Sequence, residues 1–210
     1  MMSEAVVQEV YEKIRYSLKR LEEIVRRTPL VVAILGAGPC AKAASDLTAC
    51  DNCSLKDKKK CRFYRRLLIK RMLNKMRIFA LLPEELKMKY PYMEKIVLAS
   101  PEIDLIFIFP ESPGSIAEFV QFIDSLCSDI VKKMRVLVPY NYHPFMKAFS
   151  KSFLSQLYAL FAAVHGHLYP YEDVNVEHQP PGLGLLLSPY EVIRRIVEHY
   201  RAAKYMASLK

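Results

Sequence analysis

Short apolar runs rich in β-branched residues alternate along the chain with longer amphipathic segments. Residues 30–35 (LVVAIL), 105–109 (LIFIF) and 134–139 (MRVLVP) have the length of strands and are apolar almost throughout. The segments between them carry apolar residues at helical spacing. Strands buried on both faces show such continuous apolar runs, and intervening helices favour parallel pairing. The sequence therefore predicts an α/β protein, with a three-layer α/β/α Rossmann-like fold and a mostly parallel central sheet.

The length of 210 residues predicts a single domain, 1–210, bounded by two long helices. Helical periodicity indicates an N-terminal helix over about 4–27 and a C-terminal helix over about 189–208, with a Cys-rich insertion over about 40–61. No apolar run approaches the roughly 20 residues that span a bilayer. The first residues also lack the apolar core of a signal peptide. We therefore expect a cytoplasmic protein with no membrane partner.

Two loops that follow predicted strands are the candidate ligand sites, because open parallel sheets bind ligands at the carboxyl ends of their strands. The first loop begins Gly36-Ala-Gly38, and the second reads PESPGS over 110–115. The helix that follows could be capped by Ser112, with Pro113 at its first position, or by Ser115. Gly114 would let a ligand approach the backbone. Exposed N–H groups at such a helix start would bind an anion.

Three further residues near these loops are candidates for the site. Glu118 lies off the apolar face of the predicted helix, so it either faces a ligand or closes a capping box with Ser115. Glu111 is either a site carboxylate or an exposed residue at a strand end. Tyr140 follows the 134–139 strand and could stack on a base or simply pack.

The segment IFIFPESPGSIAEFVQF resembles the E-S-P-G-S-x-A-E signature of retron-associated effectors with a nucleoside deoxyribosyltransferase-like domain. It is more distantly similar to the P-G-G-x-G-T-x-x-E loop of cytokinin-activating phosphoribohydrolases. The resemblance implies a nucleoside or nucleotide ligand whose N-glycosidic bond is cleaved or transferred. It places phosphate or sugar oxygens at Gly114 and Ser115 and the reacting sugar near Glu118. It also implies a homo-oligomer, because pockets of this type are often completed across a dimer interface.

The resemblance also implies an arginine near the ligand and a second carboxylate, for which this sequence offers candidates. Arg62 is the candidate for orienting a phosphate through its guanidinium fork. A second carboxylate is expected upstream of the signature, and both Glu94 and Glu102 are candidates. Phe119 follows the glutamate where relatives carry leucine. A non-catalytic nucleotide-sensing or regulatory module is therefore the alternative function, since such a module could lose the second carboxylate.

Four cysteines, Cys40, Cys50, Cys53 and Cys61, follow the spacing C-x9-C-x2-C-x7-C. Four thiolates in one loop could hold a structural zinc ion, and an iron–sulfur cluster accepts the same ligands. Disulfides and free thiols are the alternatives. The sequence suggests no cofactor for catalysis.

Basic residues exceed acidic residues by nine, and much of the excess lies within 56–77. Such a segment could contact nucleic acid, but no nucleic-acid-binding motif accompanies it. We therefore favour a solvated basic face over a nucleic-acid partner.

Overall fold

The structure is a computed structural model that describes residues 4–40, 47–54, 61–86, 91–124, 128–144, 152–172 and 187–209. These residues contain one five-stranded sheet in the order β2-β1-β3-β4-β5, and every neighbouring pair of strands is parallel. The strands are β1 (Val31–Leu35), β2 (Phe79–Leu81), β3 (Leu105–Ile108), β4 (Met134–Pro139) and β5 (Leu168–Tyr171). The predicted α/β fold is confirmed, and the described sheet is parallel throughout.

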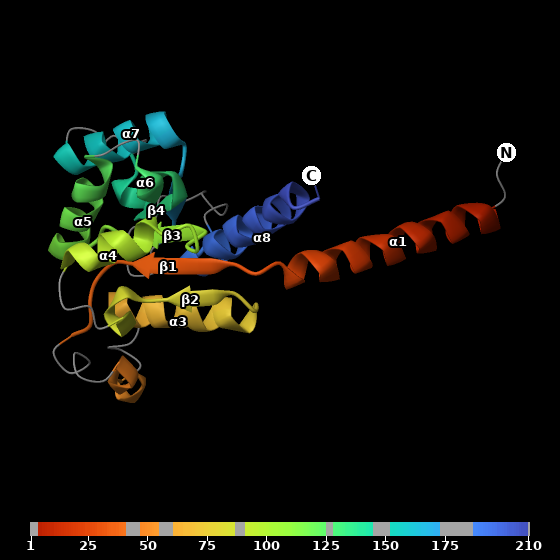
Figure 1. The fold of residues 1–210 in the computed structure, drawn as a ribbon, viewed down its shortest axis with the longest axis horizontal. Coiled ribbons are helices and arrows are strands. Elements are labelled where there is room, and N and C mark those ends of the chain that lie inside the picture. The colour runs from red at the N-terminus through yellow and green to blue at the C-terminus, as the bar shows by residue number, and fades with distance from the viewer. Residues whose placement is uncertain are drawn as a thin grey trace.

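Helices cover both faces of the sheet, which gives three layers (Figure 1). The α-helices are α1 (Glu4–Arg27), α3 (Arg62–Lys75), α4 (Pro91–Ala99), α5 (Pro113–Ile123), α6 (Asp129–Lys133), α7 (Phe153–His165) and α8 (Pro189–Ala207). Short 3-10 turns are η1 (Leu47–Asn52), η2 (Pro83–Leu86) and η3 (Tyr140–Tyr142).

Alternate residues of each strand enter two separate cores. Val32 and Ile34 of β1 pack with α3 and α8, whereas Ala33 and Leu35 pack with α4, α5, α6 and α7. This alternation follows from the two-residue period of a strand. A strand with cores on both sides must be apolar at every position, which explains the continuous apolar runs.

The first helix leaves this layered body. In Figure 1, α1 extends away from the sheet, and its junction lies beside the C-terminal turns of α8. Lys204 of α8 fixes that junction, since its Nζ donates to the carbonyl of Pro29 at 3.1 Å and pairs with Asp104 at 2.7 Å. Across the described ranges, no helix combines the length and apolarity needed to cross a membrane.

The strand order reverses between β1 and β3. From β1 the chain crosses through α3 to β2 on one side, and it then returns through α4 to β3 on the other side. The loops that leave β1 and β3 therefore separate at a topological switch point, where open α/β sheets bind ligands.

Candidate functional site

The glycine turn after β1 is packed tightly against two side chains. Gly36 has a φ of +153°, and a Cβ built on it would lie 3.1 Å from Cδ of Arg66 and 3.2 Å from Cβ of Phe109. Both the backbone conformation and the close contacts require glycine at this position. Gly38 lies farther along the turn, where a Cβ would be 4.0 Å from Oε1 of Glu84.

Arg66 of α3 holds this turn in place. It is 1% exposed, and its guanidinium donates to the carbonyls of Ile34 and Ala37 at 2.6 and 2.8 Å. The same group forms a two-pronged ion pair with Glu84 of η2, with N–O distances of 2.7 and 3.0 Å. A single buried cation thus ties the turn after β1 to the turn after β2. The rigid guanidinium fork suits this task better than a lysine ammonium would.

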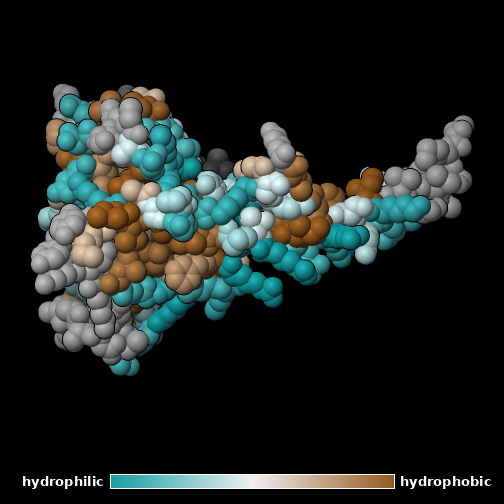
Figure 2. All heavy atoms as spheres, in the orientation of Figure 1, coloured by the Kyte–Doolittle hydropathy of each residue, from teal (hydrophilic) through white to brown (hydrophobic). Residues whose placement is uncertain are grey.

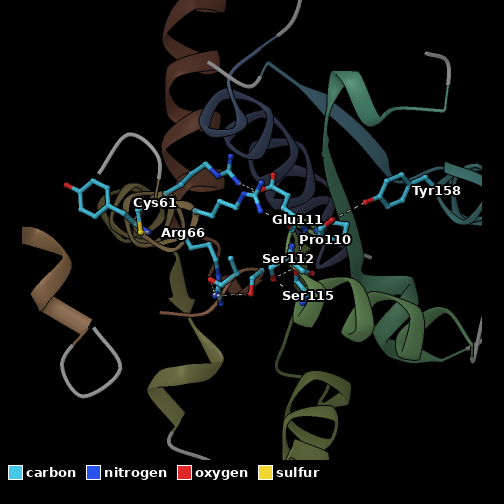
Figure 3. Close-up of polar contacts among 12 residues, drawn as sticks. Cys61, Arg66, Pro110, Glu111, Ser112, Ser115 and Tyr158 are labelled. Atoms are coloured by element: carbon cyan, nitrogen blue, oxygen red, sulfur yellow. Dashed lines mark hydrogen bonds and ion pairs between the residues drawn. The ribbon is translucent and has the colours of Figure 1, made fainter. Parts of the chain in front are cut away.

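The PESPGS turn starts helix α5 at Ser112. Ser112 Oγ accepts from the N–H of Ser115, Ser115 Oγ accepts from the N–H of Ser112, and Pro113 occupies the first helical position. Figure 3 shows the two serines close together at this turn and the hydroxyl of Tyr158, which donates to the carbonyl of Pro110 at 3.1 Å. Ser115 is 1% exposed and is engaged by the cap. Gly114 is exposed, and a Cβ on it would meet nothing within 4 Å.

Glu111 is enclosed by arginines, so the expectation of an exposed strand-end residue is wrong. Its side chain is only 6% exposed and pairs with Arg65 and, at 3.5 Å, with Nε of Arg62. The Arg65 guanidinium also lies over the rings of Phe109 and Tyr171, with its central carbon 5.0 and 5.3 Å from their centroids. Arg62 therefore contacts Glu111. Arg65, which the sequence did not single out, is the more buried of the two arginines that pair with Glu111.

Glu118 does not cap its helix, because the capping box is closed by Ser112 and Ser115 one turn earlier. The pKa of Glu118 is raised to about 7, mainly by burial and also by the charges of Glu94 and Glu84, against a lowering effect of Arg66. The pKa of Glu94 is raised too, by burial and by Glu84. We call Glu84, Glu94, Glu118 and Arg66 the carboxylate site. Within this site the Glu118 carboxyl can give up or take up a proton near neutral pH.

The structure gives different roles to the two residues predicted as candidates for the second carboxylate. Glu94 of α4 belongs to the carboxylate site, whereas Glu102 is an exposed residue that bonds with Ser100 in the turn before β3. Glu84 was missed by sequence reasoning. Its signal is the Pro-Glu-Glu that begins two residues after the end of β2, at the ligand-binding edge of the sheet.

Tyr140 begins η3 immediately after β4 and is half-buried. It therefore lies at the carboxyl edge of the same sheet. Stacking of its ring on a base stays a prediction.

The described part of the basic segment is largely engaged with acidic residues. Lys70 pairs with Glu85, and Arg71 pairs with Asp51, in addition to the arginines that hold Glu84 and Glu111. Residues 55–60 of that segment lie outside the described residues. The pairing reduces the free positive charge that a nucleic acid could contact along α3.

The four predicted metal ligands lie near one another as free thiols. The pKa of the Cys50 thiol is raised to about 11, mainly by burial and also by the charges of Cys61, Cys40 and Cys53. Cys61 also caps α3, because its Sγ accepts from the N–H of Tyr64. Among the described residues, no three His, Cys, Asp or Glu side chains form a ready metal site. The structural zinc stays a prediction.

The fold and this set of side chains define a Rossmann-like α/β/α protein with coupled carboxylates at its switch point. No protein-family model matches the chain. No curated protein matches its sequence.

Proposed function

We propose that the protein binds a nucleoside or nucleotide at the carboxylate site and cleaves or transfers its N-glycosidic bond. The observation that carries the proposal is the raised pKa of Glu118, about 7, beside the acids Glu94 and Glu84 at the switch point. A carboxyl whose pKa lies near 7 can act as an acid or a base at neutral pH.

The proposed chemistry uses Glu118 and Glu94, whose carboxyl pKa values are both raised, with one in the protonated and one in the ionised form. Departure of the base breaks the bond between the anomeric carbon and nitrogen and develops positive charge on the sugar. The ionised carboxylate of the Glu94–Glu118 pair stabilises that charge, and the protonated member gives its proton to the leaving base. In hydrolysis, water then adds its oxygen to the anomeric carbon and gives a proton to the ionised carboxyl that protonated the leaving base. In transfer, a second base adds there through its nitrogen and gives its N–H proton to the same carboxylate.

Other described groups have positions that suit binding rather than proton transfer. Glu84 forms a two-pronged ion pair with Arg66, and a carboxylate accepts hydrogen bonds from sugar hydroxyls. Gly114 offers an accessible backbone N–H in the first turn of α5, where negative oxygen is favoured. A phosphate or sugar oxygen of the ligand would lie there.

The test is to incubate the protein with a panel of nucleosides, nucleotides and NAD and to measure the free base released by chromatography. We expect base from the wild type and from the control variant Glu102→Gln, which removes an exposed carboxylate outside the carboxylate site. Glu118→Gln should release base at least about 100-fold more slowly, the usual size of an acid–base contribution. The rate should follow a bell-shaped pH profile whose upper limb falls near pH 7, as Glu118 loses its proton.

Two results would refute catalysis. Equal rates for Glu118→Gln and the wild type would remove Glu118 from the reaction. Protection of the protein against thermal unfolding by a panel member, without any base release, would instead support the nucleotide-sensing alternative.

A further inference from the structure

A hollow of about 560 Å³ lies between helix α8 and the edge strand β5. Helix α8 lines it with side chains spaced one turn apart, among them Val192, Ile196 and Ala203, and His167 and Tyr169 line it from the sheet. This volume falls in the range of small-molecule pockets. The hollow shares no residue with the carboxylate site, so it is a second candidate site.

A buried charge sets this hollow apart. Arg135 is the only charged residue in the five strands of the described sheet. It lies on β4 two residues before Leu137, so it faces the side of the sheet that α3 and α8 cover. Arg135 lines the hollow and is only 8% exposed. Such a charge costs stability unless partner groups surround it.

The described residues satisfy only part of the Arg135 guanidinium. Its Nη1 donates to the carbonyls of Lys132 and Met134 at 3.1 and 2.9 Å, and no described carboxylate pairs with it. Burial lowers the pKa of Arg135, and the opposing effects come from the phenols of Tyr169 and Tyr200 rather than from an acid. Among the described groups, Nε and Nη2 are therefore left for an anion that enters the hollow.

The rest of the lining combines positive charge with apolar walls. Arg195 and His199 of α8 line the hollow, whereas no described aspartate, glutamate, asparagine or glutamine does. Apolar surface alone, such as the exposed brown side of helix α1 in Figure 2, does not specify what covers it. In this hollow the buried guanidinium calls for an anionic group, and the walls call for an apolar body beside it.

A carboxylate with an apolar body fits these groups better than a sugar phosphate does. The Nε and Nη2 atoms of an arginine lie side by side on one edge of its fork, which matches the two oxygens of a carboxylate. Sugar hydroxyls would need acceptors, and the described lining has no carboxylate or amide side chain to supply them.

The wall formed by the sheet is held in place by the protein's own contacts. The rings of His167 and Tyr169 are nearly parallel, with 9° between their planes, and the Tyr169 hydroxyl lies 3.3 Å from Nδ1 of His167. The N–H of Glu172 donates to the carbonyl of Leu187 at 3.1 Å, which holds Leu187 beside the end of β5. A wall that is already ordered lowers the cost of binding.

We propose that the hollow between α8 and β5 binds a small carboxylic acid with an apolar body, whose carboxylate is held by Arg135. The inference uses no residue of the carboxylate site, so it stands or falls independently of the proposed function.

The test is isothermal titration calorimetry of the full chain with octanoate and 4-phenylbutyrate, which carry an aliphatic and an aromatic body. At least one acid should bind with a dissociation constant below about 100 μM. The amide of that acid, which is neutral, should bind at least about tenfold more weakly. Arg135→Met should weaken the acid by at least about tenfold and leave the affinity for the amide unchanged.

Two exposed arginines provide a matched pair that does not depend on replacing a buried residue. Arg194 and Arg195 both pair with Glu191, and their side chains are 46% and 61% exposed, but only Arg195 lines the hollow. At low salt Arg195→Glu should weaken acid binding by at least about threefold, whereas Arg194→Glu should bind like the wild type.

Several results would overturn the proposal: no binding of either acid, equal affinity for an acid and its amide, or equal effects of Arg195→Glu and Arg194→Glu. Wild-type affinity for the acid in Arg135→Met would overturn it as well. AMP, a sugar phosphate, should not lose affinity in Arg135→Met. If AMP bound through Arg135 more tightly than either acid, the proposed ligand class would be wrong.

Discussion

Replacing Glu118 with glutamine should stabilise the protein at alkaline pH while slowing base release by at least about 100-fold. The pKa of Glu118 moves from its ordinary value of 4.5 to about 7 on folding. Because one pKa unit corresponds to about 1.4 kcal/mol, ionised Glu118 costs the folded state up to about 3 kcal/mol. The site is half-buried, so solvent reduces this value, and we expect about 1–2 kcal/mol.

The sign of the effect defines its pH window. Below pH 4.5 the carboxyl is neutral in both the folded and the unfolded protein, so glutamine and glutamate differ little. Between pH 4.5 and 7 only the unfolded state ionises, and the wild type loses stability. Above pH 7 both states are ionised and the deficit of the wild type stays constant.

Urea unfolding at pH 5 and pH 8 measures this window directly. The advantage of Glu118→Gln should widen by about 1–2 kcal/mol between the two pH values. Glu191→Gln is the control of opposite sign, because hydrogen bonds from Arg194 and Arg195 lower the pKa of Glu191 to about 2. That variant should lose stability at pH 8. A Glu118→Gln protein that is less stable than the wild type at pH 8 would refute the reasoning, since its carboxylate would then be favourably solvated or paired.

Three further results follow from the described geometry. Gly36→Ala should cost about 1–3 kcal/mol of unfolding free energy, since φ and two contacts below 3.4 Å oppose a side chain; Gly114→Ala, which meets no atom, should unfold like the wild type. Arg66→Met should destabilise the protein by about 3–5 kcal/mol in urea, because it leaves Glu84 and the carbonyls of the first turn without their shared donor. Elemental analysis of purified protein should find about one zinc per chain, and Cys50→Ser should lower both the zinc content and the unfolding temperature; a metal-free wild type would contradict the zinc prediction.

The sequence predicted the layered fold because each buried strand is apolar at every position, as in residues 30–35. It also located the PESPGS turn and Glu118, since glycine, proline and serine mark a helix start. Arg66 was not recognised as the clamp, because a basic helix has the same pattern whether its arginines face solvent or buried carbonyls. Glu84 was missed because a short strand followed by two glutamates resembles an exposed turn. Periodicity likewise indicated an amphipathic α1 but could not show that its apolar face is exposed.

The mutual capping of Ser112 and Ser115 has a consequence for ligand selectivity. Pro113 has no N–H, the N–H of Ser115 is bonded to Ser112, and the N–H of Ile116 already bonds the carbonyl of Ser112. Only the amide of Gly114 remains to meet a ligand in the first turn of α5. A single amide can hold one oxygen, whereas loops that bind di- and triphosphates present several. Additional phosphate groups should therefore add little affinity, and nucleosides and monophosphates should compete on nearly equal terms with longer nucleotides.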